Sequence, residues 1–400
     1  MRILYINSVY RRGSTGKIVH ELCTAANAAG HTAAVCYGRG AEVDGENVFK
    51  FGLDWETVAH AALTRLTGLT GCYSYFSTQR LLSFIDEFKP DIIHLHEPHA
   101  YFVNIKPLFN YIKAHKIPLV YTFHCEFAFT GKCGKTSGCK RWKTGCGSCT
   151  GIREYPKSMF FDFTAKMWRD KREMMTGQNM IICTPSKWLA DMVGESFLAG
   201  YPVHVVPNGI DTELFLPVDY QELRDRHGLA DEKVILSVAP GMLSNPHKGG
   251  AEVLKLAESM RDENVHFFLI GADKPEEDVP ENVTVIQHTE NQKELAAYYS
   301  MADVFVICSD METYPTTCLE ALCCGTPVAG YDAGGTAETA PEGLGLFCRY
   351  GDTAALRENV TALLNNPPEA EAFEPVRERC ASAWMYAEYE KIYHDILKKD

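Results

Sequence analysis

Two glutamates, Glu312 and Glu320, lie in a segment whose pattern could bind a polyhydroxylated ligand. An apolar run over 304–308 precedes them, and Gly325 follows them. This pattern predicts a strand, a loop carrying Glu312, and a helix that Thr316 or its neighbour caps and that carries Glu320. Ligands of open parallel sheets bind at such strand ends. One carboxylate could hold sugar hydroxyls and the other a ribose diol, although two isolated glutamates could equally be solvated surface charges.

Two further segments could bind phosphate groups. A phosphate group carries negative charge, so its site needs cations or oriented N–H donors. Lys248 follows the apolar run 234–238, and Gly13–Gly16 follows the first apolar run of the chain. Glycines allow backbone amides to approach a phosphate closely where a helix begins. Gly13–Gly16 lacks the Walker spacing, and a plain tight turn is the alternative interpretation of that segment.

The elements that must position these residues alternate along the chain. Short β-rich runs and helical patterns follow one another, which predicts parallel sheets covered by helices on both faces. We expect an α/β chain with two doubly wound, Rossmann-like domains, 1–206 and 207–380, that face each other across a cleft. A C-terminal helix over 381–400 would cross back to the first domain. The expected strands are 2–6, 32–36, 91–94, 119–122, 180–184, 203–206, 234–238, 266–270, 283–287, 304–308 and 327–330, and the expected helices are 18–29, 78–88, 105–114, 251–260, 292–301, 316–324 and 376–399.

Composition excludes several classes of protein. The net charge of −13, from 52 acidic and 39 basic residues, disfavours a nucleic-acid-binding protein. The first apolar run is too short for a signal peptide, and no run approaches the ~18 apolar residues of a membrane span. We therefore expect a cytoplasmic protein whose 15 cysteines are mostly reduced.

The segment around Glu312 and Glu320 resembles the E-x7-E region of family-four retaining glycosyltransferases, which have the GT-B fold. Other segments resemble that family in the same order along the chain: 90–96, 184–188, 207–211, 248–249 and 333–335. The resemblance implies an enzyme of the EC 2.4 class that transfers a hexosyl or related group from a nucleotide-sugar donor to an acceptor glycan. It implies no cofactor for catalysis.

The resemblance also implies roles for individual residues. It assigns His124, Glu312 and Lys248 to catalysis, with His124 contacting the donor sugar; a hydrogen-bonded structural histidine is the alternative. The family usually places an Arg beside the Lys that faces the diphosphate, whereas this chain has Met242 or His247 in that neighbourhood. The implied donor-binding residues are Gly13, Ser14, Gly16, Lys248, Glu312, Thr316, Thr317 and Glu320.

Five cysteines fall within the Gly- and Lys-rich loop over 125–150, which cannot build an apolar core, and four of them lie close together in the sequence between residues 133 and 149. A structural Zn²⁺ held by four thiolates, with sulfurs ~4 Å apart, would supply the missing order. Unligated thiols and facultative disulfides are the alternatives. The loop is similar to that of bacterial polysaccharide glycosyltransferases, which implies surface-polysaccharide assembly and a lipid-linked oligosaccharide acceptor. The candidate ligands are Cys133, Cys139, Cys146 and Cys149.

The stretch 58–76 is apolar, and Arg65 is its one charged residue. A core helix followed by a loop is the simpler interpretation. An exposed helix would instead suit peripheral docking at the inner membrane face. Two other functions stay open: a nucleotide-sugar epimerase, which needs no acceptor, and a non-catalytic module that binds sugar nucleotides.

Overall fold

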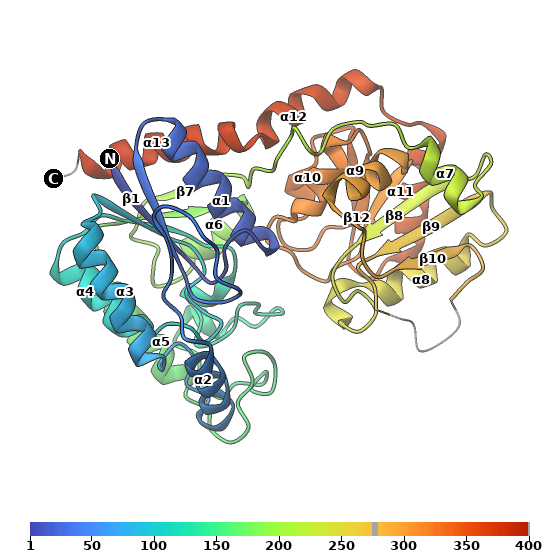
Figure 1. Ribbon diagram of the computed structural model, residues 1–400. Helices are drawn as coiled ribbons and strands as arrows, with labels where there is room; N and C mark the ends of the chain where they lie inside the picture. Colours follow the sequence, from blue (N-terminus) through green and yellow to red (C-terminus); the bar gives the residue numbers. More distant parts are fainter. Residues whose placement is uncertain (274–278, 399–400) are drawn as a thin grey trace. The chain divides into compact units, whose positions relative to one another are not determined.

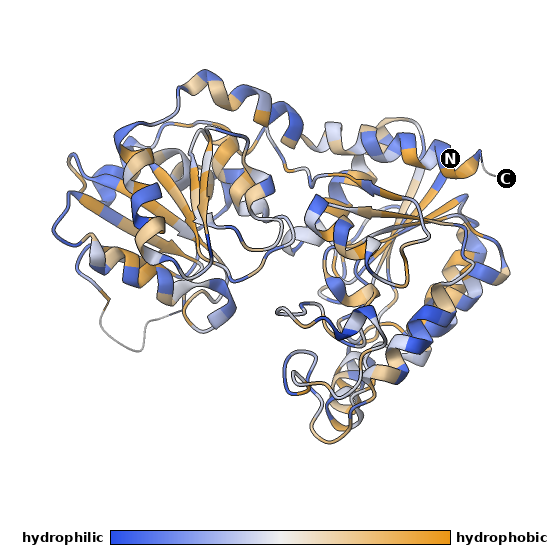
Figure 2. Ribbon diagram, turned by 180° about the vertical axis from the view of Figure 1, so that it is seen from behind, coloured by the Kyte–Doolittle hydropathy of each residue, from blue (hydrophilic) through white to orange (hydrophobic). Residues whose placement is uncertain are grey.

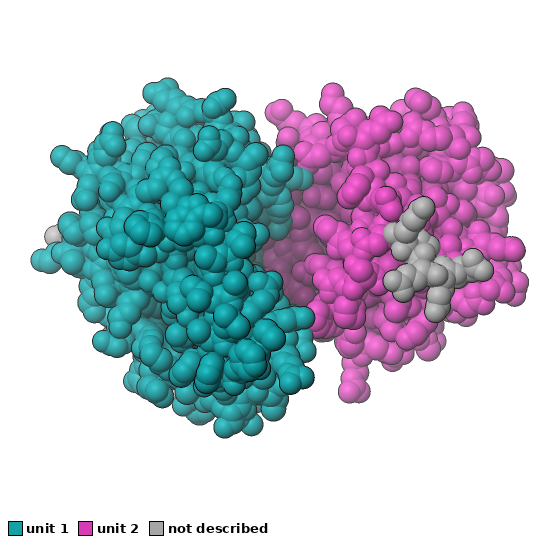
Figure 3. Space-filling model, turned by 60° about the horizontal axis from the view of Figure 1, so that its bottom comes forward, with its two compact units in different colours: residues 1–207, 385–400 teal, residues 208–384 magenta. Residues whose placement is uncertain are grey.

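The computed structural model describes residues 1–273 and 279–398, which form two compact units (Figures 1 and 3). Unit 1 comprises Met1–Pro207 and Met385–Asp400, and unit 2 comprises Asn208–Trp384. Residues 399 and 400, at the end of the expected bridging helix, lie outside the described part. Each unit contains one parallel sheet with helices on both faces, so the α/β, doubly wound fold class is confirmed.

The sheet of unit 1 has seven strands in the order β3-β2-β1-β4-β5-β6-β7, and all neighbours pair in parallel. Side chains alternate between the two faces of a strand. In β1, Leu4 and Ile6 therefore join one core cluster, whereas Ile3 and Tyr5 join the other. The strands are β1 Arg2–Asn7, β2 Thr32–Tyr37, β3 Val48–Lys50, β4 Ile92–Leu95, β5 Leu119–Thr122, β6 Met180–Thr184 and β7 Val203–Val205.

Helices of unit 1 cover these two faces. Helix α1 contributes Ile18 and Val19 to the core on one face, and α3 contributes Leu81 and Ile85 to the core on the other. The helices are α1 Gly13–Ala28, α2 Asp54–Thr67, α3 Tyr75–Phe88, α4 Ile105–Ala114, α5 Thr164–Met175 and α6 Lys187–Gly194, with short 3₁₀ turns η1 Glu126–Ala128 and η2 Arg141–Lys143.

The C-terminal segment is broken into two helices, α12 Glu374–Cys380 and α13 Ser382–Leu397, so the single helix expected over 376–399 is wrong. Ala381 is extended, with ψ 135°, and pairs with Ile210 as an isolated bridge. The Ile210 amide donates to the Cys380 carbonyl at 2.8 Å, and the Ser382 amide donates to the Ile210 carbonyl at 3.2 Å. These tertiary bonds offset the helical bonds lost at the break.

Helix α13 packs against the sheet of unit 1 through buried hydrogen bonds. The Tyr393 hydroxyl lies 2.7 Å from His94 Nδ1 and 3.2 Å from the Tyr5 hydroxyl. On the other side of His94, Nε2 lies 2.8 Å from the Thr122 hydroxyl, which also contacts Tyr389. Buried polar groups need such partners, so this network fixes α13 on the sheet.

The sheet of unit 2 has six strands in the order β10-β9-β8-β11-β12-β13. Strand order reverses between β8 and β11, which is where open parallel sheets bind ligands. The strands are β8 Lys233–Val238, β9 Val265–Ile270, β10 Val283–Ile286, β11 Val304–Ile307, β12 Val328–Tyr331 and β13 Gly345–Cys348; the helices are α7 Gln221–His227, α8 Gly250–Ser259, α9 Gln292–Met301, α10 Thr316–Cys323 and α11 Thr353–Asn365, with 3₁₀ turns η3 Pro246–Lys248, η4 Ala337–Thr339 and η5 Ala370–Phe373.

Every strand expected from the sequence is present, with each end within about one residue of the expected one. Strands β3 and β13 were not expected, because both are short and only half-buried. None of the helices in the described ranges has the length and apolar character needed to span a bilayer.

Candidate functional site

Lys248 and Glu312 meet at the switch point of unit 2. Strands β8 and β11 are parallel neighbours, and η3 and the loop after β11 both extend from this region of the sheet. Lys248 Nζ donates to Glu312 Oε1 at 2.8 Å, and the two side chains are 31% and 23% exposed. A partly exposed ion pair of this kind leaves both groups accessible to a ligand.

Gly249 allows the backbone next to Lys248 to approach the end of β11 closely. It has a φ of +75°, and a Cβ added there would lie 2.1 Å from the Cys308 carbonyl oxygen at the end of β11. Any other residue would both clash and adopt an unfavourable backbone conformation. The close approach of the two backbones therefore requires the glycine that follows Lys248 in the sequence.

The loop that carries Glu312 is bonded to the loop that follows β12. The Glu312 amide donates to the Ala333 carbonyl at 3.2 Å, and the Gly335 amide donates to the Glu312 carbonyl at 2.8 Å. Between them Gly334, with φ +76°, approaches so closely that an added Cβ would lie 2.2 Å from the Glu312 oxygen. The second glycine motif therefore fixes the backbone of Glu312.

Glu320 lies inside α10 and is buried, with 8% of its surface exposed. Its Oε2 accepts a hydrogen bond from the Tyr299 hydroxyl at 2.9 Å. Burial, reinforced by the nearby Glu320 carboxylate, raises the pKa of Tyr299 well above its usual range, so this hydroxyl stays a donor. Sequence analysis missed Tyr299, because it comes from α9 and only tertiary packing brings it to Glu320.

Helix α10 begins at Thr316 after Pro315, and no side chain caps it, so the expected Thr316 cap is wrong. Thr316 and Thr317 are half-buried residues of the first turn. The N-cap residue Pro315 offers no side-chain acceptor, so amides of the first turn can donate to an anion.

Of the two residues near the expected second cation, only His247 lies beside Lys248 at the surface. Met242 is 1% exposed and belongs to the core of unit 2. His247 Nδ1 lies 2.8 Å from Asp310 Oδ2, and the Asp310 amide donates to the His247 carbonyl at 3.3 Å. Asp310 is a second residue that sequence analysis missed.

In unit 1, Gly13–Gly16 form the first turn of α1 rather than a loop before it, so the helix starts earlier than the expected residue 18. Ser14 is exposed, whereas Gly16 is buried against Val9, where an added Cβ would lie 3.1 Å from Cγ2. No side chain caps this turn. Its amides, like those of α10, can therefore donate to an anion.

His124 follows β5 and stacks on His96, which follows β4. The ring centroids are 5.2 Å apart with an interplanar angle of 14°, and His124 Nε2 lies 2.9 Å from His96 Nδ1. Burial lowers the pKa of both histidines, so both are neutral at pH 7 and one donates to the other.

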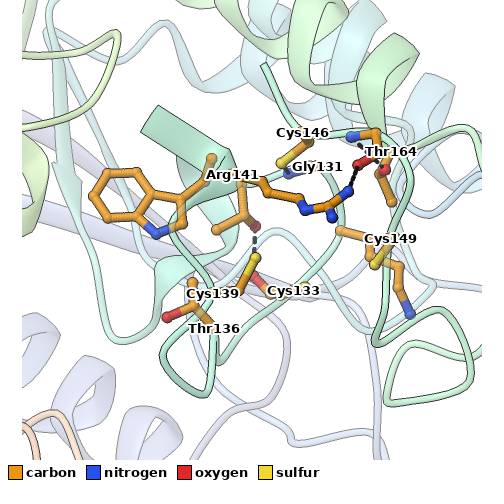
Figure 4. Close-up of a pocket in the computed structure, with 12 residues that line it drawn as sticks. Gly131, Cys133, Thr136, Cys139, Arg141, Cys146, Cys149 and Thr164 are labelled. Atoms are coloured by element: carbon orange, nitrogen blue, oxygen red, sulfur yellow. Dashed lines mark hydrogen bonds between the residues drawn. The ribbon is translucent and has the colours of Figure 1, made fainter. Parts of the chain in front are cut away.

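The four cysteines of the loop line one cavity of about 30 Å³ (Figure 4). All fifteen cysteines are free thiols. The expectation that the four sulfurs lie ~4 Å apart is wrong. Among the described residues, a single group of three or more His, Cys, Asp or Glu side chains has its ligand atoms within 4.8 Å of one another, and that group includes none of these four cysteines. One of the four sulfurs, Cys146 Sγ, accepts a hydrogen bond from the Gly131 amide at 3.2 Å.

Two buried lysines order the loop through backbone carbonyls. Lys132 Nζ donates to the Ile152, Glu154 and Pro156 carbonyls at 2.7–2.9 Å. Lys171 Nζ donates to the Phe127 and Thr130 carbonyls at 2.5 and 3.0 Å, over the Phe127 ring. Burial lowers the pKa of Lys171 to about 7.

The Lys171 amine should make stability depend on pH. Its pKa of about 7 in the folded chain lies below the unfolded value of about 10.4, so charging it opposes folding at low pH. This cost disappears as the pH rises. Between pH 7 and 9, the free energy of unfolding of metal-free protein should rise more steeply in the parent than in Lys171→Met, by about 1 kcal/mol per pH unit. Denaturant titrations measure both slopes.

Lys166→Met, at an exposed position of the same helix, is the matched control and should keep the parent's slope. Equal slopes for the parent and Lys171→Met would contradict the low pKa.

The chain is similar in sequence to known glycosyltransferase families and to individual members of them. The sequence profile described as Glycosyltransferase Family 4 matches residues 15–214, and that of Glycosyl transferases group 1 matches 219–378. A protein named as the colanic acid biosynthesis glycosyl transferase WcaC of Escherichia coli is 27% identical over 60% of this chain and 59% of its own. N-acetyl-alpha-D-glucosaminyl L-malate synthase of Bacillus anthracis is 24% identical over 56% and 61%. The matches thus span about three fifths of these relatives.

Solved structures share the fold over the whole chain. Sucrose-phosphate synthase of Thermosynechococcus elongatus has a TM-score of 0.68 at 16% identity, with both chains covered completely. The Anabaena protein HepE, solved in complex with UDP, has a TM-score of 0.67 at 14% identity, covering 99% of this chain and 100% of its own. Because a family profile matches half of the chain and these structures share its two parallel sheets, the chain belongs to Glycosyltransferase Family 4 and has the GT-B fold.

Proposed function

We propose that the protein is a retaining glycosyltransferase that moves a sugar from a nucleotide-sugar donor to an acceptor glycan. The observation that carries the proposal is the Lys248–Glu312 pair at the switch point of unit 2. It combines a cation for a diphosphate with a carboxylate for sugar hydroxyls. The family membership and the UDP bound to HepE support a nucleotide-sugar donor.

Each residue has a proposed part in the reaction. Lys248 stabilises the charge that grows on the departing diphosphate, and the amides of Thr316 and Thr317 add donors to it. Glu312 binds hydroxyls of the sugar. Glu320, oriented by Tyr299, binds the ribose diol.

Unit 1 is proposed to contribute the amides of Gly13, Ser14 and Gly16, and the neutral His124, which donates to the sugar. Substitution on one face of the sugar, with the leaving phosphate accepting the acceptor's proton, would retain the configuration. No metal takes part in these steps.

Steady-state kinetics should distinguish the proposed role of Lys248 from that of Glu320. Lys248→Ala should lower kcat about a hundredfold, because its partner charge grows in the transition state. Glu320→Gln should mainly raise the KM for the donor, about tenfold, because the diol contact exists before the reaction. A thermal-shift screen of nucleotide sugars, starting with UDP-sugars, identifies the donor for these assays.

The matched control is Lys255→Ala, an exposed lysine of α8 paired with Glu252, and it should leave both constants unchanged. Near-parental turnover in Lys248→Ala would contradict the proposal, as would rapid, complete loss of activity in EDTA while the protein stays folded. Donor conversion without any acceptor would favour an epimerase, and donor binding without turnover would favour a binding module.

We further propose that the acceptor is a lipid-linked glycan in surface-polysaccharide assembly and that unit 1 docks on the inner membrane face. Helix α2 supports this, because its polarity is inverted. It buries Glu56 and His60, whereas Trp55 and Val58 are 59% and 71% exposed. The interpretation of 58–76 as a core helix is therefore wrong.

Hydrogen bonds explain why the polar side of α2 faces inward. Glu56 accepts from the Phe76 and Ser77 amides at 2.9 and 2.7 Å, at the start of α3. His60 Nδ1 lies 2.8 Å from the Ser74 hydroxyl. With Glu56 and His60 hydrogen-bonded inside, α2 presents its apolar side outward.

These outward residues form part of a larger surface, here called the apolar patch. The Met159 amide donates to the Arg65 carbonyl at 2.7 Å, so the loop around 155–163 adjoins α2 (Figures 1 and 2). Exposed bases, including Arg65, Arg153 and Lys157, suit an anionic bilayer. The apolar patch comprises Trp55, Val58, Leu63, Leu66, Tyr75, Phe76, Tyr155, Met159, Phe160, Phe161 and Phe163.

Changing two aromatic residues of the apolar patch should weaken membrane binding. The double variant Phe160→Ser, Phe161→Ser should bind phosphatidylglycerol vesicles at least tenfold more weakly in a sedimentation assay, because each exposed ring contributes on the order of 1 kcal/mol or more when buried. Tyr350→Ser in unit 2, exposed to 47%, is the control and should bind like the parent. Equal binding by all three proteins would contradict the docking proposal.

We also propose that the cysteine-rich loop binds a structural zinc ion. The four thiols share one cavity, which Lys132 and Arg141 also line. Four thiolates and Zn²⁺ together carry a charge of −2, which these cations would offset. Binding would require the four sulfurs to move closer together.

Elemental analysis should find about one equivalent less zinc in Cys146→Ser than in the parent. The control Cys348→Ser changes a half-buried thiol of unit 2 and should leave the zinc content unchanged. The same zinc content in all three proteins would leave the loop with unligated thiols.

A further inference from the structure

A second set of potential ligands lies at the carboxyl ends of β4 and β5, outside the four-cysteine cavity. Glu97, His99 and Cys125 each offer one ligand atom, and these three atoms lie within 4.8 Å of one another. Glu97 and His99 follow β4, and Cys125 follows β5, so parallel pairing of the two strands brings them together.

The three side chains already contact one another. His99 Nε2 forms an ion pair with Glu97 Oε2, and Cys125 Sγ lies 3.6 Å from the same oxygen. Tetrahedral zinc with Zn–S of about 2.3 Å and Zn–O of about 2.0 Å would hold sulfur and oxygen about 3.5 Å apart. The distance between Cys125 Sγ and Glu97 Oε2 therefore already suits two ligands of one ion. The contact between His99 and Glu97 is shorter and would have to lengthen for an ion to bind between them.

Charge and burial point the same way. Glu97 is buried, with 7% of its surface exposed, and His99 and Cys125 are half-buried. A carboxylate and a thiolate supply two negative charges, and a divalent cation with a neutral His99 makes the whole set neutral. A neutral cluster is the least costly way to bury these groups.

We propose that Glu97, His99 and Cys125 form a binding site for a divalent cation of the zinc class. One thiolate, one imidazole and one carboxylate suit Zn²⁺ or Co²⁺ rather than Mg²⁺ or Ca²⁺, which prefer oxygen ligands. Binding replaces the thiol proton of Cys125, which leaves to solvent. Three protein ligands leave a fourth position for water. The ion would link the loops after β4 and β5 beside His124, independently of the glycosyltransferase proposal.

The experiment titrates Co²⁺ into the full chain carrying Cys146→Ser and Cys149→Ser, which remove half of the other thiol set. We expect about one equivalent to bind, with a thiolate-to-cobalt charge-transfer band and the visible bands of tetrahedral cobalt. Adding Cys125→Ser should abolish the charge-transfer band. His99→Ala and Glu97→Gln should each weaken binding at least tenfold.

His115→Ala, an exposed histidine of unit 1, is the matched control and should leave the titration unchanged. Circular dichroism of each variant tests its folding, and Glu97→Gln keeps the shape of the side chain if the others unfold. No charge-transfer band in the background variant, or a band that persists after Cys125→Ser, would overturn the proposal.

Discussion

Parallel strand pairing is the constraint on which both candidate sites of this protein depend. Parallel neighbours place all their carboxyl ends along one edge, so the loops that follow them meet even when they are far apart in sequence. In unit 2 this brings the segment after β8 to the loop after β11, and Lys248 to Glu312. In unit 1 it brings the residues after β4 to those after β5, and His96 to His124.

Two glycines allow the loops at this edge of the sheet of unit 2 to approach one another closely. Gly249 lies against the end of β11 and Gly334 against Glu312, each with a positive φ and no room for a Cβ. These two contacts let three loops share one small region. The chemistry of the region then follows from charge, because a lysine and a carboxylate within hydrogen-bond distance leave a site that can exchange its internal ion pair for a ligand.

Hydrogen bonding of buried polar groups explains the less regular parts of unit 1. Helix α2 is inverted because Glu56 and His60 find partners inside, which leaves its apolar residues exposed. The cysteine-rich loop lacks an apolar core, and Lys132 and Lys171 order it by donating to main-chain carbonyls. In both places the usual rule of apolar inside and polar outside gives way to satisfied hydrogen bonds.

The sequence by itself determined the two doubly wound sheets, because continuous apolar runs separated by helical periodicity have few other solutions. It also determined that Glu312, Lys248 and His124 follow strands. Only the tertiary structure decided which groups touch: Tyr299 on Glu320, Asp310 on His247, and Ile210 at the break before α13. These partners come from other elements, and local periodicity carries no information about contacts between elements. The inverted face of α2 could not be predicted for the same reason, because its polar partners lie at the start of α3 and just before it.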